Sequence, residues 1–330
     1  MISFIIPCFN VQETIEETVV SITRETDLFC EIILVNDGSS DATLEVLQKI
    51  SFGHSNVKVV NKTNGGVSSA RNLGLHFATQ EYVCFLDGDD TMDNSFFEKV
   101  TSYLYQNRDI IMYGFDKENK DLSKRSYKVY YSKNYILDYL LGKMYIHISS
   151  LLLKRSMLLR NHVVFDEDIY YSEDREFIVK CLRCSTSLAI VPNILFHYKF
   201  RSTSAMNVAK FTMKRMTSIV AMERVLNMFA SNSLEAKAAL LQLQLTIILV
   251  LKKYLHFGQK DKNIENVFDK YFQYLNKISL LKMNKYSMFV LLLIFVRKFS
   301  DKLFFFVLKK YKQWIFLYVH LFIEMINQNI

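Results

Sequence analysis

The sequence predicts an α/β fold with a mostly parallel sheet, followed by a C-terminal, mainly helical extension. Three observations support this prediction. Short β-rich runs alternate with helical patterns over the first third of the chain, and polar clusters follow four of those runs. From about 205 to 280 neither proline nor strand-like alternation interrupts a helical pattern. Strands that alternate with helices in this way are typical of βαβ units.

The predicted elements follow in order along the chain. Runs rich in β-branched and aromatic residues predict strands at 2–7, 31–36, 57–61, 82–86 and 109–115. Helical periodicity predicts helices at 11–24, 41–50, 66–78 and 94–106, the second opened by the capping-type residue Asp41. We expect one domain over 1–205 and a helical region over 206–330.

Composition indicates a folded protein. Half of the 330 residues are apolar and 22% are charged, which argues against disorder. The five cysteines lack the spacing of a disulfide scaffold, and no basic segment opens the N-terminus. We therefore expect a cytoplasmic location with reduced thiols.

Polar clusters stand at the ends of the first four predicted strands. They are Pro7–Asn10, Asp37–Asp41, Asn61–Gly66 and Asp87–Asp90. Ligands of parallel α/β sheets bind at the carboxyl ends of the strands, so these clusters predict one shared site. The stretch "VNDGSSD" has the glycine pattern of neither a dinucleotide-binding nor a P-loop fold.

Taken as an ordered set, these motifs resemble the family-2 glycosyltransferases. The motifs are "IIPCFN", "VNDGSSD", "NKTNGGVSSARNLGL", "FLDGDD" and "SED", and the resemblance covers roughly residues 1–205. It implies the GT-A fold, with a Rossmann-like, mostly parallel sheet, and an inverting transferase that uses a UDP-sugar. For the donor nucleotide it implies the following residues: Pro7, Phe9, Asn10, Glu13, Asp37, Asn64, Gly65, Arg71, Asp87, Arg201 and Ser204.

The residue chemistry fits a nucleoside diphosphate. Asp37 can accept a hydrogen bond from a uracil N–H, and Phe9 can pack on the base. Gly65 permits close approach of the backbone. Arg71 can pair with the diphosphate, or it can form a buried ion pair with Asp87 or Asp89.

The crowded carboxylates of "FLDGDD" need a positive partner, because like charges at short range repel each other. The resemblance implies Mn²⁺ or Mg²⁺, with Asp89 as the direct ligand and Asp87 on the ribose or on metal-bound water. These ions prefer one or two carboxylates together with substrate phosphates. Asp90 either caps the next helix or contacts the sugar, and a solvated turn is the alternative for all three.

A carboxylate must take the proton of the attacking hydroxyl. The resemblance implies Asp174 in "SEDREF" as this base, with Glu173 as the second candidate. We expect a solvated face for the acidic residues Asp166, Glu167, Asp168 and Glu176. Downstream, "FHYKFRSTS" provides His197, either as a metal ligand or as a core residue.

The segment 286–330 has a basic, amphipathic pattern. Leu303, Phe306 and Trp314 share one helical face, and lysines border it. Such a helix is typical of the surface of an anionic membrane, although packing on the protein's own core is the alternative. Bulky aliphatic residues interrupt the basic ones, so we expect no nucleic-acid partner.

The resemblance, together with the pattern of 286–330, thus implies an inverting glycosyltransferase on the cytoplasmic face of the cell membrane. Its donor would be a UDP-sugar, and its acceptor a glycan or lipid-linked glycan in surface polysaccharide synthesis. The alternatives are a catalytically silent nucleotide-sugar-binding subunit and a sugar nucleotidyltransferase. The latter would need a glycine-rich loop with Arg and Lys after the first strand, which "PCFNVQET" lacks.

Overall fold

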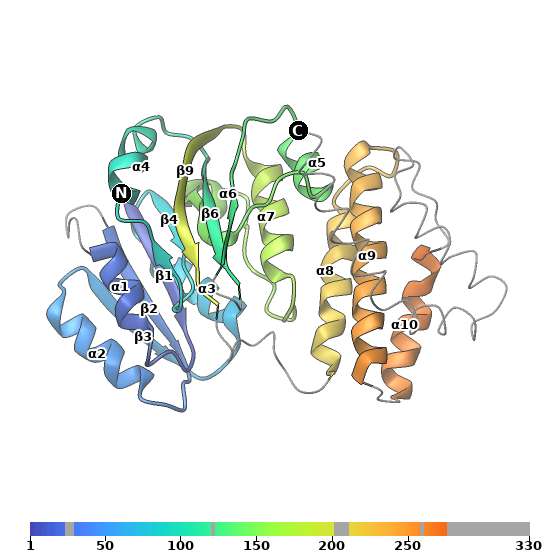
Figure 1. Ribbon diagram of the computed structural model, residues 1–330, viewed down its shortest axis with the longest axis horizontal. Coiled ribbons are helices and arrows are strands. Elements are labelled where there is room, and N and C mark those ends of the chain that lie inside the picture. Colours follow the sequence, from blue (N-terminus) through green and yellow to red (C-terminus); the bar gives the residue numbers. More distant parts are fainter. Residues whose placement is uncertain (24–29, 120–122, 201–210, 258–260, 276–330) are drawn as a thin grey trace. The chain divides into compact units, whose positions relative to one another are not determined.

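The computed structural model describes residues 1–23, 30–119, 123–200, 211–257 and 261–275 (Figure 1). They form two compact units. The first takes in the described residues of Met1–Lys133 and Met144–Asn207, and the second those of Asn134–Lys143 and Val208–Ile330.

One mixed sheet forms the centre of the first unit. Its strand order is β3-β2-β1-β4-β8-β6-β9-β5, and β7 pairs with β6. The strands are β1 (Ile2–Cys8), β2 (Cys30–Asp37), β3 (Val57–Lys62), β4 (Tyr82–Phe85), β5 (Thr91–Met92), β6 (Ile110–Glu118), β7 (Lys124–Tyr127), β8 (Leu151–Lys154) and β9 (Leu188–Tyr198). The first four strands run parallel to their neighbours among themselves, and β6 runs parallel to β9. The predicted α/β class with a mostly parallel sheet is confirmed.

Helices connect these strands. In the first unit they are α1 (Ile15–Thr23), α2 (Thr43–Gly53), α3 (Val67–Phe77), α4 (Phe96–Leu104), α6 (Arg155–Arg160) and α7 (Glu173–Cys184), with a short 3-10 turn at Ile148–Ser150. Asp41 Oδ1 accepts a hydrogen bond from the Thr43 backbone N–H at 3.0 Å, which satisfies a donor at the start of α2. The four predicted helices correspond to α1 to α4.

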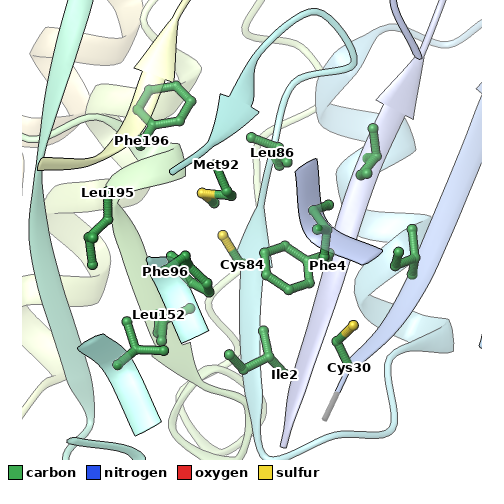
Figure 2. Close-up of a cluster of buried hydrophobic side chains, with 14 of the residues drawn as sticks. Ile2, Phe4, Cys30, Cys84, Leu86, Met92, Phe96, Leu152, Leu195 and Phe196 are labelled. Carbon is green, nitrogen blue, oxygen red and sulfur yellow. The ribbon is translucent and has the colours of Figure 1, made fainter. Parts of the chain in front are cut away.

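Apolar side chains fill the space on one side of the central strands (Figure 2). Phe4 of β1 packs edge-to-face on Phe96 of α4, with ring centroids 5.8 Å apart. Cys84 of β4 points into the same cluster and is fully buried. The apolar run that precedes the carboxylates is therefore a core strand, and it fixes the point at which the next residues leave the sheet.

The second unit is helical. It contains α5 (Tyr135–Leu140), α8 (Thr217–Asn227), α9 (Leu234–Phe257) and α10 (Lys262–Leu275). Two glutamines of α9 bind the ends of neighbouring helices: Gln242 Nε2 donates to the Leu140 carbonyl at 2.6 Å, and Gln244 Nε2 to the Tyr274 carbonyl at 2.9 Å. Each amide satisfies a carbonyl that its own helix leaves open.

Among the described residues, one segment, Leu234–Tyr254 of α9, is long and apolar enough to cross a membrane. This holds by length and composition only, and 56% of its apolar window is buried inside the structure. The predicted amphipathic segment 286–330 lies outside the described residues.

The helical segment 134–143 lies inside the range that the sequence assigned to the first domain, 1–205, yet it packs with the second unit. α5 contacts α9, and Asn134 Nδ2 donates to Glu235 Oε1 at 2.6 Å. This packing joins residues about one hundred positions apart, which local periodicity does not encode. The division at 205 stays a prediction.

Candidate active site

The carboxyl ends of β1, β2, β3 and β4 lie at one edge of the sheet because these strands run parallel. Hydrogen bonds join the loops that follow them. Asn10 Oδ1 accepts from the Ser40 backbone N–H at 2.9 Å, and Thr14 Oγ1 donates to the Gly88 carbonyl at 2.9 Å. The structure therefore brings the polar clusters after these strands into one site.

The loop after β1 presents an aromatic ring to solvent. The Phe9 side chain is 50% exposed, although large apolar residues are usually buried. Pro7 is half-buried at the end of β1, and Glu13 is exposed. Asn10 has a left-handed backbone (φ 53°), a conformation that Asn tolerates better than most residues. Phe9 is thus available to a planar ligand.

Asp37, at the end of β2, is buried and holds the loop that follows β3. Its Oδ1 accepts from Lys62 Nζ at 2.7 Å and from the Gly65 N–H at 2.9 Å, and its Oδ2 accepts from the Gly66 N–H at 2.8 Å. Asn64 Nδ2 donates to the Asp37 carbonyl at 2.8 Å. Organising this loop is the role that the contacts show for Asp37, and its predicted bond to uracil stays a prediction.

The two loops approach so closely that Gly38 has no room for a side chain. Its φ is +66°, and a Cβ added there would lie 2.6 Å from the backbone nitrogen of Asn64. This close approach explains the glycine in "NDGSS" without a bound phosphate.

Arg71 of α3 is the positive partner of the carboxylates. Its Nη2 donates to Asp87 Oδ1 at 2.8 Å, and its Nη1 donates to Glu173 Oε1 at 3.3 Å. The Arg71 side chain is 3% exposed, and its Nε has no hydrogen-bond partner among the described residues. The ion pair that the sequence left as an alternative is present, and it connects the loop after β4 to the start of α7.

The charge of Arg71 acts unequally on its two partners. Burial opposes ionisation of both, but the guanidinium leaves the pKa of Asp87 below its usual value. For Glu173, burial and the neighbouring Asp174 outweigh Arg71 and raise the pKa to about 7. Asp87 is therefore ionised at neutral pH, whereas Glu173 titrates there.

Asp174 lies beside Glu173 in the first turn of α7. It is half-buried, and its Oδ1 accepts from the Arg175 N–H at 2.7 Å. Ser172, which precedes the helix, has a left-handed backbone (φ 66°), a conformation that costs energy for a residue with a Cβ. The two candidate bases thus differ in environment, because Glu173 is bound to Arg71 and Asp174 is not.

Asp90, whose role the sequence left open, connects two elements. It is buried, and its Oδ1 accepts from the Lys199 N–H just after β9 at 2.9 Å. Asp89 beside it is half-buried. Burial, and then the charges of Asp90, Asp89 and Asp87, raise the pKa of Tyr198 to about 12. The end of β9 therefore lies against the acidic loop.

Both ring nitrogens of His197 bind carboxylates. Nδ1 lies 2.9 Å from Asp116 Oδ1, and Nε2 lies 3.2 Å from Asp93 Oδ2. Neither nitrogen is thus directed at an ion held by Asp87 and Asp89. These contacts favour the structural alternative for His197 over metal ligation.

His147 belongs to the site although the sequence offered no signal for it. Its ring stacks on Phe196, with centroids 4.8 Å apart, and Nδ1 accepts from the Ser149 N–H at 3.2 Å. Burial lowers the pKa of His147, while the charges of Asp87 and Asp174 oppose that shift. The imidazole is thus neutral, with its proton on Nε2, beside both carboxylates.

The remaining predictions have mixed outcomes. Arg201 and Ser204 lie outside the described residues. Glu167 and Asp168 are exposed as expected, but the expectation of a solvated position is wrong for Glu176. Glu176 is 2% exposed and pairs with Lys180 at 3.1 Å, because it lies on the face of α7 that packs inward.

Comparisons with known proteins agree with this geometry. Residues 3–160 match the family described as Glycosyl transferase family 2. The uncharacterized glycosyltransferase EpsJ of Bacillus subtilis (strain 168) is 31% identical over 211 residues, which are 60% of this chain and 61% of that protein. The minor teichoic acid biosynthesis protein GgaB of the same organism is 30% identical over 218 residues, 63% of this chain and 24% of GgaB. The chain thus spans less than two thirds of the length of either relative.

A solved structure has the same fold. S. aureus TarS 1–349 in complex with UDP-GlcNAc covers 94% of this chain and 91% of its own, with a TM-score of 0.64 and 18% sequence identity. At this identity the likeness concerns the fold, which is of the expected GT-A type. The ordered motifs, the sheet and the family match lead to one conclusion: residues 3–160 of the chain match glycosyl transferase family 2.

Proposed function

We propose that the chain is an inverting glycosyltransferase that moves a sugar from a UDP-sugar to a hydroxyl of a glycan acceptor. The observation that carries this proposal is the Arg71 bridge, which holds Asp87 of the acidic loop and Glu173 of α7 in one site. A glycosyltransferase needs both segments: the acidic loop to hold the leaving diphosphate, and the start of α7 to take a proton from the acceptor hydroxyl. TarS, which shares the fold, has been solved with UDP-GlcNAc, and this supports a UDP-sugar donor.

Asp174 is the proposed general base. Glu173 is paired with the Arg71 guanidinium, whereas the bond that Asp174 accepts comes from the Arg175 backbone N–H, so Asp174 Oδ2 would take the proton of an acceptor hydroxyl. A single base on one side of the anomeric carbon and a departing diphosphate on the other lead to inversion.

Asp87 and Asp89 would hold a divalent Mn²⁺ or Mg²⁺. Their carboxylates are hard oxygen donors, and no group of three His, Cys, Asp or Glu side chains in the described part of the chain could hold a metal ion by itself. This donor set fits an ion that relies on substrate phosphates for its other ligands. When bound, such an ion neutralises charge on the leaving nucleoside diphosphate.

A donor screen tests the proposal. We expect the protein to hydrolyse or transfer from one UDP-sugar in the presence of Mn²⁺, and Asp89→Ala to reduce this rate at least about 100-fold, as expected when a charge-stabilising group is lost. Asp168→Ala, in an exposed acidic residue, serves as the control and should keep full activity. Binding of UDP without turnover of any UDP-sugar would instead support a silent nucleotide-sugar-binding subunit.

We further propose that the protein acts in surface polysaccharide synthesis at the cytoplasmic face of the membrane. GgaB is a teichoic acid biosynthesis protein, and the sequence of 286–330 has the basic, amphipathic pattern of an interfacial helix. Removing 286–330 should abolish co-sedimentation with vesicles that contain anionic lipid. Co-sedimentation of the shortened protein would refute a membrane role for this segment.

A further inference from the structure

Three neighbouring strands present one row of side chains beside the acidic loop. Lys117 of β6 is paired in register with Tyr198 of β9 on one side and with Arg125 of β7 on the other. Residues paired across strands point to the same face of a sheet. Accordingly, Lys117 Nζ lies 4.6 Å from the centroid of the Tyr198 ring. We call Tyr127, Tyr145, Tyr198, Lys117 and Arg125 the cationic aromatic face.

The two cations of this face are directly opposite each other, an arrangement that destabilises a strand pair. Within the described ranges, neither Lys117 nor Arg125 has a carboxylate within ion-pair distance. The acidic neighbour in the same strand, Glu118, is in register with Lys124, so both point to the other side of the sheet. An anion bound between Lys117 and Arg125 would offset this repulsion.

Aromatic rings extend the face. The Tyr127 ring stacks on Phe115, with centroids 4.7 Å apart, and lies 5.0 Å from the Tyr145 ring. Arg125 Cζ lies 5.5 Å from the centroid of the Tyr127 ring. Tyr127, Tyr145 and Tyr198 are all partly exposed. Rings with one apolar surface and one polar tip suit sugars, whose C–H faces are apolar and whose edges carry hydroxyls.

His147 places the face next to the reacting groups. Its ring lies 5.8 Å from that of Tyr198, and the charges of Asp87 and Asp174 act on it. Since Nδ1 accepts from Ser149, the proton is on Nε2, which has no hydrogen-bond partner among the residues that the structure describes. His147 thus contacts a ring of the cationic aromatic face and also interacts with the proposed base.

We propose that the cationic aromatic face binds the acceptor, and that this acceptor is an anionic glycan, a sugar that bears a phosphate group. This inference rests on the proposed transferase function. The strand order separates the cationic aromatic face from the loops that follow β1, β2 and β3, because β4 and β8 lie between β1 and β6 in the sheet. The acceptor therefore approaches Asp174 from the β6–β9 side, whereas the nucleotide occupies the ends of β1 to β3.

Calorimetric titration of the full chain with glucose 6-phosphate and with glucose tests this proposal. We expect glucose 6-phosphate to bind at least tenfold more tightly than glucose, and to bind equally well when UDP saturates the protein. Lys117→Gln and Arg125→Gln should each weaken binding of the phosphate about 3- to 10-fold, a loss reduced by solvent because Lys117 is exposed and Arg125 partly so. Lys124→Gln removes the same charge from the opposite side of β7, and this control should leave the affinity unchanged.

Equal binding of glucose and glucose 6-phosphate, or an equal loss in Lys124→Gln, would overturn the proposal. Competition between UDP and glucose 6-phosphate would overturn it as well, since the cations would then serve the donor diphosphate. Failure of the transferase function is seen separately, as absence of UDP-sugar hydrolysis in the wild-type protein. That result would show that the face does not serve to bind an acceptor for transfer. The titration alone decides whether the cationic aromatic face binds anionic sugars.

Discussion

Asp174→Asn should lower the rate of sugar transfer by about 1,000-fold and leave the affinity for UDP unchanged, in line with the 10²- to 10⁴-fold usual for a general base. The amide keeps the size and the hydrogen bond from the Arg175 N–H but does not accept a proton from the acceptor. Steady-state transfer rates, together with calorimetric titration of UDP, measure the two quantities separately.

Glu173→Gln is the matched control for this prediction. The pKa of Glu173 is raised to about 7, so its protonated form, which glutamine imitates, is well populated at neutral pH. We expect this variant to retain transfer within tenfold of wild type. If Glu173 were the base instead, Glu173→Gln would show the larger loss, and the inflection near pH 7 in the wild-type pH–rate profile would disappear.

Local sequence patterns were sufficient for β1 to β4 and β6 and for the place of the site, whereas β5, β7, β8 and β9 were not predicted. β1 to β4 are apolar runs that end in polar residues, and the parallel arrangement then brings Asn10, Asp37, Gly65 and Asp87 to one edge. Each of these inferences depends on neighbouring residues and on the geometry common to all parallel sheets. The same reasoning identified Arg71 as a partner of the carboxylates.

Contacts between distant segments were not predictable in this way. His147 enters the site because it packs on Phe196, about fifty positions later, and no residue spacing around it indicates a role. Similarly, the bonds of His197 to Asp93 and Asp116 depend on the pairing of β9 with β5 and β6. The roles of such residues follow from tertiary packing, which a single sequence does not display.

Arg71→Met should lower the free energy of unfolding by about 3–5 kcal/mol at pH 8, the usual cost of removing one partner from a buried ion pair. Methionine fills much of the same volume but leaves Asp87 and Glu173 without their guanidinium. Arg71 is 3% exposed, so water does not replace the lost charge without rearrangement. Chemical denaturation of both proteins measures the difference, and Arg160→Met, in an exposed arginine, should change stability by less than about 0.5 kcal/mol.

The pH dependence distinguishes an electrostatic loss from a packing defect. In the wild type, the lowered pKa of Asp87 stabilises the folded state. This stabilisation is fully present above pH 3.8, the pKa of Asp87 in the unfolded chain, and it is lost as the pH falls. Without Arg71, burial raises the pKa of both carboxyls above their unfolded values, so the variant loses stability as pH rises. The difference in the free energy of unfolding between the wild type and Arg71→Met should therefore grow from about pH 4 to about pH 7 and above. The lower limit is set by the pKa values of the carboxyls in the unfolded chain, and the upper one by the pKa of Glu173 in the folded protein. A loss of equal size at pH 4 and pH 8 would show that Arg71 contributes through packing, and the electrostatic bridge between the acidic loop and α7 would have to be abandoned.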